Sequence, residues 1–97
     1  MKRLEPTIRR ADILSAAVTA ASVKGYLNVT RLDIAQQAGV SEGLITHYFT
    51  SMSAMRSAIM SEAVRLRCLS IIRDGIAHRD PLAAEASKEL QKQALAG

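Results

Sequence analysis

Histidine, cysteine and hydroxyl side chains are the residues of this chain that could do covalent or metal chemistry, and their spacing supports neither. His47 and His78 have no carboxylate or cysteine partner at metal-ligand spacing, and Cys68 is the only cysteine. No Ser-His-Asp set, glycine-rich phosphate loop or pair of catalytic carboxylates can be identified. We therefore expect no enzyme activity, no metal and no cofactor. A single cysteine excludes an internal disulfide and is typical of the reducing cytoplasm.

Positive charge is concentrated in the first third of the chain. The 97 residues contain 13 Lys and Arg against 9 Asp and Glu, for a net charge of +4. The first 31 residues hold six basic and two acidic side chains, and the rest holds seven of each sign. Such a basic end suits a polyanion, either nucleic acid or an acidic membrane surface, although a solubilising tail fits the charge equally well. The basic residues are Lys2, Arg3, Arg9, Arg10, Lys24 and Arg31.

The stretch 30–49 has the spacing of two short helices separated by a tight turn. Ala35 is small, which allows a second helix to cross closely, and Gly39 permits a positive φ in the turn. Val40 fills the space between the helices, and Ser41 caps the second one. This is helix-turn-helix geometry, in which the second helix enters the major groove of DNA. The alternative is a helical hairpin that only packs.

These residues and their neighbours resemble the DNA-binding head of the TetR family of transcription regulators. The resemblance covers roughly residues 8–55. The matching residues are Ile13, Leu14, Ala17, Gly25, Tyr26, Thr30, Ile34, Ala35, Ala38, Gly39, Val40, Ser41, Gly43, Ile45, Tyr48, Phe49, Ser51 and Met55.

The resemblance implies a homodimer that binds double-stranded DNA at a palindromic operator, usually as a repressor. Carried over by position, Arg31 would touch phosphate with Thr30 beside it, and exposed amides behind Ser41 favour phosphate as well. The residues facing base edges would be Glu42, Gly43 and Thr46. The flanking contacts would come from Leu44, His47 and Tyr48, and Ser51 completes the expected set.

Two departures from the family pattern concern the DNA backbone. The family commonly has Tyr where this chain has Thr46 and Lys where it has Met52, and both usually bind the backbone. We expect the basic N-terminus to compensate, with Lys2, Arg3, Arg9 and Arg10 lying along the backbone or reaching into the minor groove.

Helical periodicity along the whole chain predicts an all-α fold of about five helices. Apolar residues make up 48% of the chain but aromatic residues only 3%, so the core must be built from aliphatic side chains. We expect a helix-turn-helix head at residues 1–52 and a helical dimerisation segment at residues 53–97. The predicted helices span residues 7–22, 31–38, 42–49, 53–74 and 81–95.

The predicted helix 53–74 carries two apolar stripes, and a chain of this length has little left to cover both. We therefore expect a partner subunit to complete the core. The residues predicted for this dimer interface are Met60, Val64, Cys68, Ile71, Leu82 and Leu90.

Residues 53–97 are too few and too small to form the effector pocket that the TetR family normally carries. We expect a repressor without a small-molecule inducer, controlled by its own concentration, such as a control protein of a plasmid or phage. The alternative is a protein-interaction module that binds another regulator. No run of about 18 apolar residues exists, so no membrane span is expected.

Overall fold

Helices make up the regular structure of the protein throughout the part that the structure describes. The computed structural model describes residues 6–86 and 88–96, with side chains from residue 9 onward. No strand occurs in these residues, in agreement with the predicted all-α class. The seven helices are α1 (Pro6–Lys24), α2 (Arg31–Ala38), α3 (Glu42–Tyr48), α4 (Met52–Leu66), α5 (Leu69–Ala77), α6 (Pro81–Ala84) and α7 (Lys88–Ala96).

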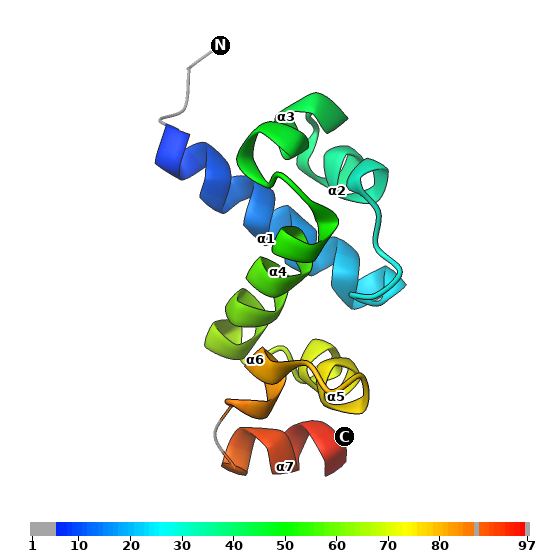
Figure 1. Cartoon of the computed structure of the whole chain (residues 1–97), viewed down its shortest axis with the longest axis vertical. Coiled ribbons are helices and arrows are strands. Elements are labelled where there is room, and N and C mark those ends of the chain that lie inside the picture. Colours follow the sequence, from blue (N-terminus) through cyan, green and yellow to red (C-terminus); the bar gives the residue numbers. More distant parts are fainter. Residues whose placement is uncertain (1–5, 87, 97) are drawn as a thin grey trace.

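The helices gather at the two ends of an elongated molecule that measures 44 × 22 × 20 Å. Figure 1 shows α2 and α3 with α1 at one end and α5, α6 and α7 at the other, with α4 leading from one end to the other. α1 contacts α2 and α4, and α5 contacts α4, α6 and α7. We call α5, α6 and α7 the base, on which the helix-turn-helix head stands.

The first three helices are confirmed to within two residues of the predicted bounds because local signals set their ends. Thr30 forms a complete capping box with Asp33 at the start of α2. Gly39 ends α2 in the left-handed conformation with φ 71°, and Gly25 follows α1 with φ 89°. Ser41 caps α3 through the Leu44 amide.

The predicted helix 53–74 is wrong, because the chain breaks it into α4 and α5. Arg67 adopts a left-handed φ of 58°, and the amide of Cys68 donates to the Ala63 carbonyl at 2.8 Å. Neither Gly nor Pro marks this position, so no local signal announces the break. The gain comes from packing, since the break lets α5 turn back against α4.

The predicted helix 81–95 is also divided, so residues 6–86 and 88–96 contain seven helices where about five were predicted. Its start is confirmed, since Asp80 caps α6 through the Leu82 amide with Pro81 in the first turn. The side-chain amide of Gln91 in α7 donates to the carbonyls of Ala84 and Ala86, at 3.0 and 2.6 Å. These bonds satisfy backbone acceptors that the end of α6 leaves open.

Side chains of the same protomer cover α4 on more than one side. Met55, Ile59, Met60 and Ala63 are all fully buried, and α4 contacts α1, α5 and α6. Met60 lies against Gly75 of α5, and α4 also packs against α6. Both apolar stripes that suggested a partner subunit are therefore largely covered within the chain itself.

A hydrogen bond between distant residues ties the head to the base. The hydroxyl of Tyr26, in the turn after α1, donates to Asp80 Oδ2 at 3.2 Å, and the other oxygen of Asp80 accepts the Leu82 amide. Tyr26 is 1% exposed. Burial and the neighbouring Asp80 carboxylate raise the pKa of Tyr26 to about 12.

We predict that Gly75→Ala destabilises the protein although alanine is the better helix former. An added Cβ would overlap the Met60 methyl group and lie 2.8 Å from Ala83 Cβ. Such overpacking costs about 1–3 kcal/mol, more than the roughly 1 kcal/mol gained from helix propensity. Urea denaturation followed by circular dichroism measures the loss. Gly43→Ala is the control, because its Cβ meets only Ser41 Oγ at 3.8 Å. A stabilising Gly75→Ala change would contradict this packing of α4, α5 and α6.

We predict that the free energy of unfolding falls between pH 10 and about 12 in a way that depends on Tyr26. The tyrosine ionises near pH 10 in the unfolded chain, whereas its pKa in the folded protein is raised to about 12. The raised pKa stabilises the folded state below pH 10, and this contribution is lost as the pH rises through the folded value. Denaturation series at several pH values should show a shallower fall for Tyr26→Phe than for the wild type. An equal fall in both proteins would contradict the assignment.

Candidate nucleic-acid interface

The predicted turn between α2 and α3 is confirmed in its details. Ile34 and Ala35 of α2 are buried, and Val40 is half-buried against the core. The Val40 amide donates to the Ala35 carbonyl at 3.0 Å, directly after the left-handed Gly39. The two helices contact one another across this turn. The geometry is that of a helix-turn-helix.

α3 has one buried side and one open side. Ile45 is fully buried, and Leu44 and Tyr48 are half-buried beside it. The open side is formed by Glu42, Gly43, Thr46 and His47, all exposed. The Thr46 hydroxyl donates to the Glu42 carbonyl at 3.2 Å, and the His47 and Tyr48 rings meet edge to face with centroids 5.0 Å apart. The structure therefore brings the predicted base-reading residues to one accessible face.

Three of the residues predicted to bind DNA are helix caps. Thr30, Ser41 and Ser51 are exposed, and each hydroxyl oxygen accepts a backbone amide at the start of α2, α3 or α4, at 3.0 to 3.2 Å. Their hydroxyl hydrogens stay available as donors. Arg31 begins α2, where it is half-buried, and its Nε is buried without a hydrogen-bond partner among the described residues.

The basic residues of the N-terminal third have different surroundings. The Arg10 guanidinium carbon lies 4.7 Å from the centroid of the Phe49 ring, and Arg9 is half-buried. Lys24 pairs with Asp33 at 3.1 Å, so its charge is compensated locally. Lys2 and Arg3 lie outside the described residues.

The electrostatics at the start of α2 favour an ionised Asp33. The Thr30 amide donates to Asp33 Oδ2 at 2.9 Å and, together with the Lys24 ammonium, holds the pKa of Asp33 below its usual range. Asp33 therefore places a negative charge beside the capping box, close to the region where Thr30 and Arg31 are expected to meet phosphate.

The predicted dimer-interface residues fall into two groups. Met60, Ile71 and Leu90 are buried within the protomer, at 0%, 1% and 7% exposure. Val64, Cys68 and Leu82 are half-buried and partly accessible. Nothing in the single chain tests which surface meets a second copy, so the interface stays a prediction.

Sequence reasoning missed the role of Phe49, which lies beneath Arg10. The contact joins residues that are 39 positions apart, so no local pattern could reveal it.

The described residues also show no helix long and apolar enough to cross a membrane. Among those same residues, no three histidine, cysteine or carboxylate side chains gather as metal ligands would.

Comparison with known proteins supports this interpretation of the head. The family description "Bacterial regulatory proteins, tetR family" matches residues 13–59. The HTH-type transcriptional regulator BetI of Escherichia coli O45:K1 (strain S88) is 33% identical over 91 residues, covering 94% of this chain and 44% of the relative. BetI of E. coli strain K12 / DH10B is 32% identical with the same coverage. The chain thus spans less than half the length of these relatives, both of which are transcriptional regulators. No solved structure matches it.

We predict that the Ser41 cap contributes about 1 kcal/mol to the free energy of unfolding. Ser41→Ala removes the acceptor of the Leu44 amide, which lies 3.2 Å from Ser41 Oγ. Ser41→Asp should keep most of the stability because aspartate caps equally well. Denaturant unfolding of the three proteins measures both effects. Equal stability of the alanine and aspartate variants would contradict the role of the cap.

Proposed function

Since residues 13–59 place this chain in the TetR family of bacterial regulatory proteins, we propose that it binds double-stranded DNA sequence-specifically as a homodimeric repressor. The observation that carries the proposal is the open side of α3. Its side chains are short or polar, and Gly43 leaves the backbone there without a covering side chain. The opposite side of the helix is anchored in the core by the buried Ile45. A slender helix of this kind fits the major groove.

The exposed residues of α3 have the chemistry for reading base edges. Thr46 can hydrogen-bond a base or contact a thymine methyl group, and Glu42 can accept from cytosine N4. Gly43 lets the backbone approach closely. His47, with Leu44 and Tyr48, would flank these contacts along the sugar-phosphate backbone.

The phosphate contacts would come from the residues around α3. The hydroxyls of Thr30, Ser41 and Ser51 lie at the starts of three helices and keep a free donor hydrogen. Arg31 brings a positive charge to the start of α2. These contacts would fix the register of the head on the duplex without reading sequence.

A homodimer would place two copies of α3 about 34 Å apart, one turn of DNA, on an inverted repeat. The candidate interface residues that remain accessible are Val64, Cys68 and Leu82, and Leu66 nearby in sequence is 48% exposed. They belong to α4, the junction of α4 and α5, and α6, whereas α3 lies at the other end of the molecule (Figure 1). A dimer made through them would leave both recognition helices free.

We also propose that this chain needs no small-molecule inducer. Four surface grooves measure between 250 and 340 Å³. The one beside α4 and α7 is lined largely by Arg65, Arg67, Glu89 and Gln93. Small-molecule sites are mostly apolar and enclosed, and here the interior between α4 and the base is filled by the chain's own side chains.

The alternative function, binding to another regulator protein, has less support. An interaction surface on α3 would present large apolar side chains at its centre. Glu42, Gly43, Thr46 and His47 occupy that surface instead.

We predict that selection against random duplexes recovers an inverted repeat, and that Thr46→Glu abolishes binding to it. A glutamate at this position would bring a negative charge and extra bulk to the bases, with an expected loss of at least about 100-fold in affinity. Thr19→Glu is the matched control, because Thr19 is also exposed on a helix. Its hydroxyl donates to the backbone carbonyl of Ser15 at 3.1 Å, as the Thr46 hydroxyl donates to the carbonyl of Glu42. Gel-shift titration measures both variants.

Three outcomes would overturn the proposal. Recovery of no preferred sequence would exclude sequence-specific binding. A single unrepeated site would contradict the dimer. Equal affinities of the Thr46 and Thr19 variants would show that α3 is not the recognition helix.

A further inference from the structure

The helix-turn-helix supplies almost no positive charge of its own. After Arg31, the next basic residue is Arg56, and the stretch between them contains Asp33 and Glu42. Protein–DNA affinity depends on neutralising phosphates with Lys and Arg. The cations that would hold α3 in the groove must therefore be brought from other elements by the fold.

Arg10 of α1 is the cation that the fold brings to the end of α3. Its guanidinium lies over the ring of Phe49, which caps the C-terminus of α3 by donating its amide to the Ile45 carbonyl at 2.8 Å. Phe49 is 3% exposed, so its ring has a fixed position, while Arg10 is exposed. Figure 1 shows the first turns of α1 and the helix α3 at the same end of the molecule.

The charge of Arg10 is not compensated within the described residues. There the carboxylates of Asp33 and Glu62 pair with Lys24 and Arg65, and none pairs with Arg10. Stacking on the Phe49 ring also leaves the N–H groups of the Arg10 guanidinium able to donate hydrogen bonds to an anion. A guanidinium presents its N–H groups in its own plane, so the face can rest on a ring while the edge binds an anion.

We propose that Arg10 binds a DNA phosphate at the C-terminal end of α3, and that Phe49 is the positioning residue that holds its guanidinium ready. This inference rests on the proposed function and adds a specific contact to it. Holding the side chain in place before binding lowers the entropy lost on association. A bidentate contact from the guanidinium edge fits phosphate geometry, which a lysine at this position would not reproduce.

The test is a salt titration of DNA binding by variants of the full chain. Arg10→Ala should weaken binding about tenfold at about 0.1 M salt and reduce the slope of log affinity against log salt by about one. The loss should be alike for the selected duplex and for unrelated duplexes, because phosphate contacts do not read sequence. Arg10→Lys should keep most of the slope but lose part of the affinity.

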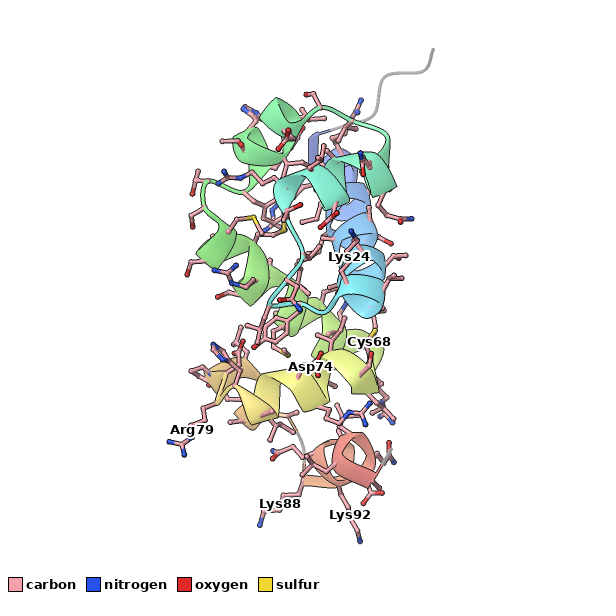
Figure 2. The ribbon with its side chains drawn as sticks, turned by 90° about the vertical axis from the view of Figure 1, so that its right-hand side faces the viewer. Lys24, Cys68, Asp74, Arg79, Lys88 and Lys92 are labelled. Atoms are coloured by element: carbon pink, nitrogen blue, oxygen red, sulfur yellow. The ribbon has the colours of Figure 1, made fainter. Side chains whose placement is uncertain are left out.

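Two control variants separate a phosphate contact from general effects of charge or packing. Lys92→Ala removes a cation from α7, where Figure 2 shows Lys92 projecting from the far end of the molecule, and should change neither affinity nor slope. Ile45→Val loosens the packing under α3 while leaving Arg10 on its ring, so the salt slope should stay as in the wild type.

Phe49 is tested by a double-mutant cycle with Arg10. Phe49→Leu should weaken binding about two- to fivefold when Arg10 is present, which corresponds to the loss of a cation–π contact, and should have no further effect in the Arg10→Ala background. Circular dichroism confirms that each variant folds, and the cycle cancels any loss of packing common to both backgrounds.

The results distinguish the two proposals. If the wild type binds no duplex, the proposed function fails. If the wild type binds and Arg10→Ala binds equally well with the same slope, the phosphate contact is wrong. If the effects of Phe49→Leu and Arg10→Ala simply add, Phe49 does not position Arg10.

Discussion

The anchoring of α3 is the constraint on which the rest of the structure depends. A helix of seven residues is far too short to persist in water by itself, because the cost of its first turn is never recovered. Here both ends and one side are held. The Ser41 hydroxyl caps the start, the Phe49 amide closes the end, and Ile45 is buried beneath the middle. α2 packs directly against α3, and α1 packs against α2 and α4, so the short helix keeps an open side facing outward.

The sequence predicted the elements whose ends are set by local chemistry, and it failed where packing decides. Thr30 with Asp33, Gly39 and Ser41 are local signals, and α1, α2 and α3 were predicted to within two residues. No Gly or Pro marks the break after Leu66. Arg67 adopts the left-handed conformation there, and the break lets α5 pack on α4. A continuous helix over residues 53–74 would carry two apolar stripes along its length, whereas the break turns part of this surface inward and buries Met60 and Ile71 within the chain.

The candidate site shows the same division. Exposure of Glu42, Gly43, Thr46 and His47 follows from helical periodicity and a correct cap, so the sequence was enough to place them. The sequence shows the excess of positive charge in the N-terminal third, but it does not show which of these basic side chains are paired with a carboxylate. Lys24 is paired with Asp33, whereas Arg10 rests on Phe49. The two contacts depend on how α1 packs in the fold, and among the described residues only Lys24 of these two cations has a carboxylate partner.

The position of α4 between head and base has an evolutionary consequence. In the proposed complex the base contacts would come from Glu42, Gly43 and Thr46 of α3, whereas the distance between two recognition helices in a dimer would follow from how α4 meets the base. Substitutions near the bend at Arg67 would alter operator spacing and leave base preference intact, and substitutions on α3 would do the reverse. Operator sequence and operator geometry could therefore diverge independently among descendants of this chain.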